Sequence, residues 1–204
     1  MVIQIRGTSG AGKSTLVQRL LREHGGERVK ESLPVGDGAE VELPVWHCDG
    51  DLCVIGRYAN LDGVSRGLGG VVVAGATGEA IVAHYGERHA HLVWENYRGS
   101  TELPRGAALE RARELGLVWA TLDTPVEECL ARIVRRRSER EANVGAPLNE
   151  AAIRAHHREV EALGGVAARS GIRCVSLAHE DAYGQLHALL LEGGLDCRHA
   201  GVGG

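Results

Sequence analysis

A glycine-rich stretch close to the N-terminus constrains the fold of this chain more than any other feature. Residues 7–14 have the sequence Gly-Thr-Ser-Gly-Ala-Gly-Lys-Ser, which matches the pattern G-x-x-x-x-G-K-[ST] at every fixed position. The β-rich run Val2 to Arg6 precedes this stretch, and an amphipathic segment from Lys13 to about Glu23 follows it. In this order, a strand, a glycine loop and a helix offer backbone N–H groups and a positive helix end to phosphate oxygens. The pattern therefore predicts a phosphate-binding loop of the Walker A type.

The polar side chains of this stretch indicate a nucleoside triphosphate and a metal ion as ligands. Lys13 is one of only two lysines in the chain, and we expect its ammonium group to contact the β- and γ-phosphates. The Ser14 hydroxyl is expected to bind Mg²⁺. ATP and Mg²⁺ are therefore the predicted cofactors. The predicted nucleotide-binding residues are Gly7, Thr8, Ser9, Gly10, Ala11, Gly12, Lys13, Ser14 and Thr15.

Strand-like and helix-like segments alternate along most of the chain, which predicts an α/β fold. The apolar runs on either side of Asp49-Gly50-Asp51 indicate an inserted β-hairpin. Alternating strands and helices favour three layers, with a central, mainly parallel sheet covered by helices on both faces. The remaining patterns predict strands at 91–95, 117–122 and 172–177 and helices at 103–115, 125–137, 149–163 and 181–191.

The chain of 204 residues is expected to form a single domain, because neither a repeat nor a clear internal boundary interrupts it. This domain is expected to span residues 1–192, and residues 193–204 are expected to form a flexible, glycine-rich tail. Three segments give weaker signals. Residues 27–40 suit a loop or a weak strand, residues 59–70 are loop-like, and residues 71–88 combine strand chemistry with a helical end.

Composition excludes several classes of protein. No apolar run approaches the ~20 residues of a membrane helix, and the 44% hydrophobic content is too high for a disordered chain. A net charge of −4 and an aromatic content of 3% argue against binding nucleic acid without regard to sequence. The first residues lack the features of a signal peptide, and the five cysteines contain no C-x-x-C pair. We therefore expect a cytoplasmic protein with reduced thiols; its oligomeric state is left open.

Arginines gather on the helix expected at 125–137. Arg132 and Arg136 stand four residues apart and so share one flank of this helix. In an enzyme that transfers phosphoryl groups, such arginines neutralise charge and act as a lid, here at about 132–148. The alternative is a solvated surface on which Glu139 and Glu141 are the partners of these arginines.

Taken together, these motifs resemble the P-loop kinase superfamily, close to the nucleoside-monophosphate, gluconate and shikimate kinases and the zeta-toxin-like group. The resemblance implies that Arg132 lies near the adenine and Arg136 near the phosphates. The segments Val54-Ile55-Gly56-Arg57-Tyr58, Gly69-Gly70 and Leu92-Val93-Trp94-Glu95 are also similar to a group of phage-encoded P-loop kinases. Many members of that group carry an acid after the glycine pair and a glycine after the glutamate, where this chain has Val71-Val72 and Asn96.

Several acids and arginines are candidates for the acceptor side of such a site. Glu95 ends a predicted core strand, so its carboxylate is expected at the edge of the sheet where ligands bind. Asp49 and Asp51 resemble the paired acids of shikimate-type kinases, although Asp-Gly is also an ordinary hairpin turn, which we favour. The other candidate substrate residues, each of which also suits an exposed loop, are Arg57, Asp62 and Arg98.

The sequence therefore predicts an ATP-dependent kinase, a transferase whose proposed catalytic residues are Lys13, Glu95, Arg132 and Arg136. The predicted acceptor is a nucleotide, a nucleoside or another small molecule with a hydroxyl group. One alternative is a phage-type kinase of a hydroxymethylated base in DNA. The other is a regulatory P-loop ATPase without a phosphoryl acceptor, although the chain lacks the N-K-x-D motif of GTPases.

Overall fold

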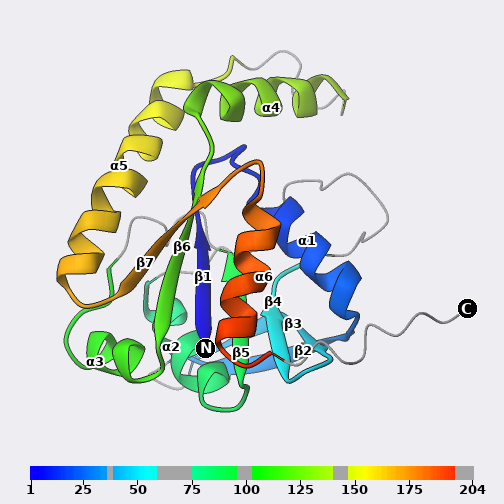
Figure 1. Cartoon of the computed structure of the whole chain (residues 1–204), viewed down its shortest axis with the longest axis vertical. Coiled ribbons are helices and arrows are strands. Elements are labelled where there is room, and N and C mark those ends of the chain that lie inside the picture. Colours follow the sequence, from blue (N-terminus) through cyan, green and yellow to red (C-terminus); the bar gives the residue numbers. More distant parts are fainter. Residues whose placement is uncertain (36–38, 59–74, 96–102, 140–146, 196–204) are drawn as a thin grey trace, which may run out of the picture.

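The computed structural model describes residues 1–35, 39–58, 75–95, 103–139 and 147–195. Within these residues, seven strands form one sheet in the order β2-β3-β4-β5-β1-β6-β7 (Figure 1). The last five in this order are mutually parallel, and β2 and β3 are antiparallel to their neighbours. The strands are β1 (Val2–Arg6), β2 (Glu27–Pro34), β3 (Glu40–Cys48), β4 (Leu52–Ile55), β5 (His91–Glu95), β6 (Leu117–Asp123) and β7 (Arg173–Ala178). The predicted α/β class with a mainly parallel sheet is confirmed.

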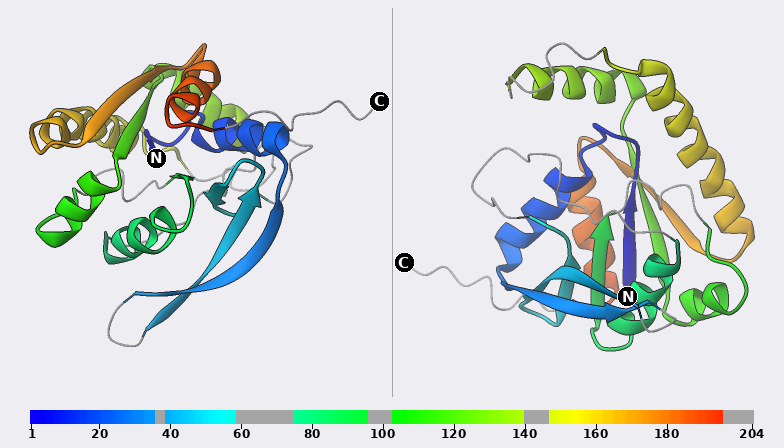
Figure 2. Two further views of the ribbon diagram at one scale, coloured as in Figure 1. Left: turned by 60° about the horizontal axis from the view of Figure 1, so that its bottom comes forward. Right: turned by 180° about the vertical axis from the view of Figure 1, so that it is seen from behind.

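Helices cover both faces of this sheet (Figure 2). Helices α1 (Lys13–His24) and α6 (Ala182–Glu192) pack on one face, and α2 (Gly75–Gly86) and α3 (Ala107–Glu114) pack on the other. The end of α5 (Glu150–Arg169) joins the second group through Ala167. Helix α4 (Val126–Glu139) and the start of α5 lie beyond the carboxyl ends of β1 and β6, at the top of Figure 1. Among the helices that the structure describes, none combines the length and apolarity needed to cross a lipid bilayer.

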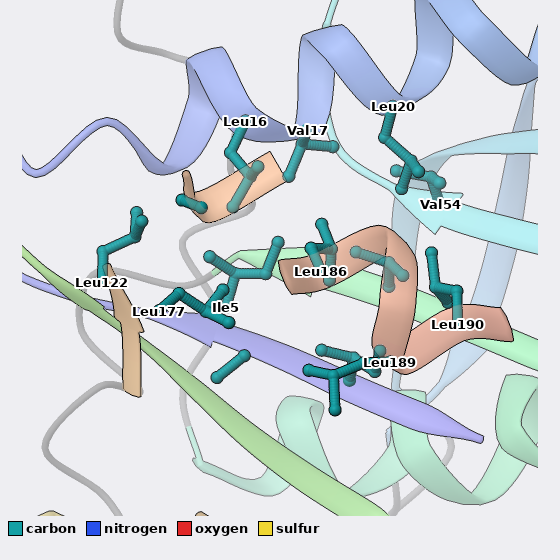
Figure 3. Packing of buried hydrophobic residues seen from close by; sticks show 14 of the residues in the cluster. Ile5, Leu16, Val17, Leu20, Val54, Leu122, Leu177, Leu186, Leu189 and Leu190 are labelled. Carbon is teal, nitrogen blue, oxygen red and sulfur yellow. The ribbon is translucent and has the colours of Figure 1, made fainter. Parts of the chain in front are cut away.

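The two sides of the sheet bury separate apolar clusters, because neighbouring residues of a strand point to opposite faces. Ile3 and Ile5 of β1 pack with the leucines of α1 and α6 (Figure 3), whereas Val2 packs with Trp94 and Trp119 on the other face. All five residues of β1 are buried. A strand that is buried on both faces is typical of the centre of a parallel sheet, and β1 is thereby fixed at the position from which the glycine-rich stretch departs.

The outermost strand of the sheet, β2, is the element for which the sequence pattern was least definite. Residues 27–34, expected to be a loop or a weak strand, form β2 and pair with β3 along eight residues. The resulting ribbon extends away from the body in the left view of Figure 2. The sequence left a loop and a weak strand open because most of the side chains of this segment are exposed and polar, and Leu33 alone is fully buried.

Three smaller differences follow from packing that the sequence does not reveal. Helix α5 continues to Arg169, beyond the predicted end at 163, and so carries Gly164 and Gly165 within it. The ambiguous segment 71–88 contains helix α2, whereas residues 59–70 lie outside the described part. Leu195 is buried in the α1–α6 cluster, so the described start of the predicted tail belongs to the fold.

Arg6, the last residue of β1, is an unusual member of the core. It is 0% exposed, and its guanidinium lies 3.4 Å from the centre of the Trp119 ring. Within the described residues its three guanidinium nitrogens make no hydrogen bond. Burial lowers the pKa of Arg6 to about 9. A buried charge without an opposite charge beside it destabilises the folded state, even when an aromatic ring offsets part of the cost.

We expect Arg6→Met to raise the free energy of unfolding by about 1 kcal/mol or more, equivalent to an increase in Tm of about 2–4 °C for a domain of this size. Between pH 9 and the ordinary pKa of arginine, the unfolded chain holds a proton that the folded chain has lost. The wild type therefore gains stability as the pH rises through 9, and the variant does not. Urea unfolding at pH 7.5 and pH 10 should show a smaller difference in the free energy of unfolding between wild type and Arg6→Met at pH 10 than at pH 7.5. A variant less stable than wild type at pH 7.5 would contradict this account.

Candidate active site

Residues 7–14, called the glycine loop below, connect β1 to α1 and lie against the start of α4. A Cβ atom placed on Gly10 would stand 2.3 Å from the Cys129 carbonyl oxygen, far closer than atoms can approach. Gly10 also has a φ of +83°, which favours glycine. The glycine at position 10 therefore permits the close contact between the loop and α4.

The Ala11 carbonyl fixes the loop to the chain that follows β6. It accepts hydrogen bonds from the Thr124 hydroxyl at 2.8 Å and from an Arg132 guanidinium nitrogen at 3.3 Å. Arg132 also donates to Glu128 on its own helix, at 2.8 Å. The Thr124 hydroxyl, just before α4, thus bonds to the glycine loop rather than to the first turn of its own helix. Arg132 therefore lies beside the glycine loop, and its role there stays a prediction.

Lys13 occupies the centre of the glycine loop. Its side chain is buried, and its ammonium donates to the carbonyls of Gly7 at 2.8 Å and Thr8 at 3.0 Å. Burial lowers the pKa of Lys13; the Glu95 carboxylate opposes this effect, and the positive charge of Arg136 adds to it. Arg136 is therefore close enough to act electrostatically on the same place as Lys13. The structure brings together three of the four residues predicted to be catalytic around one ammonium group, with Arg132 adjacent.

Glu95 ends β5, the strand beside β1, and is 2% exposed. The Tyr58 hydroxyl donates to its carboxylate at 3.0 Å, and the Ser14 side chain also hydrogen-bonds to it. Burial raises the pKa of Glu95, whereas Lys13 and these two hydrogen bonds lower it and so favour the carboxylate. A hydroxyl and a carboxylate side by side are oxygen ligands of the type that Mg²⁺ prefers, with phosphates and water completing its coordination. Ser14 and Glu95 fit that ion.

Two of the predicted acceptor residues, Asp49 and Asp51, lie away from this site. Asp49 and Asp51 lie in the turn before β4, and because β4 runs parallel to β1, this turn is at the opposite edge of the sheet from the glycine loop. Asp51 accepts from the Ala90 backbone N–H at 2.8 Å and pairs with His89 at 3.0 Å. These acids therefore belong to a hairpin turn, the alternative that the sequence favoured.

The other candidates on the acceptor side give less information. Arg57 is exposed and follows β4, at the same edge as Glu95. Asp62 and Arg98 lie outside the described residues. Of the predicted nucleotide-binding residues, Thr15 is exposed on the first turn of α1, and the others form the glycine loop itself.

Three residues make contacts at this site that the sequence did not predict. Tyr58 holds Glu95, and His156 and His157 on α5 hydrogen-bond to Thr8 and to the Thr124 carbonyl. Tyr58 belongs to a segment already noted for its similarity to phage kinases, whereas nothing in the local sequence distinguishes His156 and His157; all three reach the site from distant elements.

The geometry defines an α/β protein whose buried lysine, hydroxyl and carboxylate meet at the carboxyl edge of a parallel sheet. No protein-family model matches the chain. One curated relative, a protein named 5-hmdU DNA kinase from Pseudomonas phage M6, is 28% identical over 162 residues, which cover 78% of this chain and 80% of the relative. The chain is thus similar to a phage kinase over most of its length.

We expect Tyr58→Phe to raise the pKa of Glu95, because it removes a hydrogen bond that stabilises the carboxylate. The titration of the Glu95 carboxyl carbon by NMR measures this change. Tyr183→Phe is the matched control, since Tyr183 donates to Glu23 at the far end of α1, at 2.6 Å. An unchanged pKa of Glu95 in Tyr58→Phe would show that the hydroxyl does not support the carboxylate.

Arg136→Ala should raise the pKa of Lys13, because it removes a positive charge that disfavours the protonated ammonium. The chain has only two lysines, so the side-chain carbon signals of Lys13 and Lys30 are easily separated by NMR. Arg135→Ala serves as control, because the Arg135 side chain is 73% exposed and pairs with Glu139. Equal effects of the two substitutions on Lys13 would place Arg136 on a solvated surface rather than at the loop.

Proposed function

We propose that this protein is an ATP- and Mg²⁺-dependent kinase that transfers the γ-phosphoryl group of ATP to a hydroxyl acceptor. One observation carries the proposal: the buried Lys13 ammonium lies inside a complete G-x-x-x-x-G-K-[ST] loop, next to Ser14 and the Glu95 carboxylate. The similarity to a protein named as a kinase supports it independently.

In this proposal the protein acts mainly by positioning and by neutralising charge. The glycine loop and Lys13 hold the β- and γ-phosphates, and Arg132 and Arg136 face the charge that develops during transfer. Ser14 and Glu95 would hold Mg²⁺, which would supply positive charge that polarises the phosphates. The acceptor oxygen forms a bond to the γ-phosphorus, the bond between that phosphorus and the β–γ bridging oxygen breaks, and ADP leaves with the bond's electrons. The acceptor proton passes to solvent or to a nearby base.

The position of Glu95 favours a metal-binding role over that of an acceptor base. Its carboxylate hydrogen-bonds to the Ser14 side chain and interacts with Lys13, so it faces the phosphate side of the site. Burial has the largest effect and raises the pKa of Glu95, while the charge of Lys13 and the hydrogen bonds from Ser14 and Tyr58 oppose it; a bound cation would further favour the ionised form that a metal ligand requires. A general base would be aimed at the acceptor hydroxyl instead.

Two classes of acceptor are proposed. The first is a nucleoside, a nucleotide or another small molecule with a free hydroxyl group, which the site chemistry permits and which needs no basic surface. The second is a hydroxymethylated base in DNA, and the specific observation in its favour is the name of the phage relative. The net charge of −4 does not favour extended contact with DNA phosphates, so salt-sensitive binding would be a discriminating property of the second class.

Incubation with γ-³²P-labelled ATP and Mg²⁺ tests both classes together. The panel contains nucleosides, nucleotides, sugars, a DNA oligonucleotide with one 5-hmdU and the same oligonucleotide with thymidine in its place. Label on the 5-hmdU strand alone would establish the DNA class, and label on a small molecule the first class. Release of inorganic phosphate with every acceptor left unlabelled would contradict the kinase proposal and favour a regulatory ATPase.

Lys13→Ala should abolish phosphoryl transfer and leave the fold intact. Lys13 supplies the point charge on the transferring phosphates, and Lys30, the other lysine, lies on β2 in an ion pair with Glu42. A loss of at least 100-fold in kcat is expected for such a group. Circular dichroism and Tm verify the fold, and Lys30→Ala is the matched control. Near-normal turnover of the Lys13→Ala protein would refute the proposed mechanism.

A further inference from the structure

Helix α5 contacts the glycine loop through side chains that have no assigned role in the proposed reaction. The Nδ1 atom of His156 lies 3.1 Å from the Thr8 hydroxyl oxygen, within hydrogen-bonding distance. Thr8 is 1% exposed, and its hydroxyl also lies 3.5 Å from the Ile153 carbonyl oxygen, one turn earlier in the helix. The contact joins residues 148 positions apart in the chain. This partly buried hydrogen bond ties α5 directly to the second residue of the loop.

The next residue of α5 makes a parallel contact. His157 donates from Nε2 to the Thr124 carbonyl at 3.1 Å, and the Thr124 hydroxyl in turn donates to the Ala11 carbonyl. Consecutive helical side chains point about 100° apart, so the two histidines reach different sides of the loop. One contact acts at the start of the loop and the other, through Thr124, near its end.

The contact of His156 leads directly to Lys13. The backbone carbonyl of Thr8 accepts a hydrogen bond from the Lys13 ammonium at 3.0 Å, beside the Gly7 carbonyl at 2.8 Å. The Thr8 side chain and the Thr8 carbonyl belong to one residue, so restraining the hydroxyl also restrains the orientation of the carbonyl. Helix α5 thus helps to fix the position of the Thr8 carbonyl, which accepts a hydrogen bond from the buried Lys13 ammonium.

We propose that His156 is a positioning residue of this site, which holds Thr8 and, through the Thr8 carbonyl, keeps Lys13 in place for the phosphates. The inference rests on the proposed kinase function for its kinetic consequences and on the contacts alone for its structural ones. The benefit is preorganisation, since a charge that is already in place need not be reoriented during transfer. The same contact couples the loop to α5, the helix that follows the predicted arginine lid.

Kinetics of four substitutions test this role. His156→Ala should lower kcat about 10-fold or more, because small displacements of a charge-stabilising group cost that much, while KM for ATP changes less than kcat. His156→Asn offers a polar atom near the position of Nδ1 and should recover most of the loss. Thr8→Val should resemble His156→Ala, and Thr8→Ser, which keeps the hydroxyl, should resemble wild type. Glu159→Ala, on the exposed side of α5, is the control.

A double-mutant cycle shows whether the two side chains act as a pair. The protein with both His156→Ala and Thr8→Val should lose little more kcat than either single variant, because each substitution already breaks the same contact. Multiplicative losses, or a normal kcat for His156→Ala, would overturn the inference.

The position of the Lys13 side chain can be followed by NMR without any enzymatic turnover, so the positioning role of His156 can be tested separately from kinase activity. The side-chain carbon signal of Lys13 in the NMR spectrum should move in His156→Ala and stay in place in Glu159→Ala. A wild-type protein that phosphorylates nothing would sink the kinase proposal alone. A Lys13 signal that His156→Ala leaves unchanged would sink the positioning role, whatever the activity.

Discussion

The buried ammonium group of Lys13 is the constraint on which the rest of the site depends. Burial disfavours its charge, and the carbonyls of Gly7 and Thr8 compensate by accepting its protons. Glu95 supplies the opposite charge from the neighbouring strand, and Arg136 adds a like charge from α4. A buried ammonium beside a second positive charge is suited to an anionic ligand, because the negative charge of the ligand would stabilise the protonated form of Lys13. The proposed binding of ATP phosphates follows from this balance.

The glycine loop is held from two sides, by elements far apart in the sequence. Helix α4 presses its first turn against Gly10, and Thr124 and Arg132 bind the Ala11 carbonyl. Helix α5 reaches Thr8 through His156. Leu130 and Ile133 of α4 pack with Ile153 of α5, so the two helices also support each other. The arginines of α4 are therefore carried on a support that is fixed to the loop itself.

Local patterns predicted the strands at the centre of the sheet and the β3–β4 hairpin, and they left the structure of the outermost strand, β2, open. The strands β1, β5, β6 and β7 have apolar runs long enough to be recognised, and the glycine loop has its own motif. The β2 strand is polar and exposed along most of its length. Its pairing with β3, and not its amino-acid composition, therefore determines that it is a strand. Asp49 and Asp51 could be acceptor residues or a hairpin turn from the sequence alone, and the pairing of β4 with β3 and β5 shows the turn, which the sequence favoured. Tyr58 and His156 act through distant contacts that no local pattern encodes.

A crystal structure with Mg²⁺ and a non-hydrolysable ATP analogue tests the central claim most directly. We expect the β- and γ-phosphates of the analogue to lie within hydrogen-bonding distance of the Lys13 ammonium and of the backbone N–H groups of the glycine loop. We also expect Mg²⁺ between the Ser14 hydroxyl and a phosphate oxygen, with the Glu95 carboxylate on the same side of the ion. A nucleotide bound elsewhere, with the Lys13 ammonium still bonded only to the Gly7 and Thr8 carbonyls, would contradict the central claim.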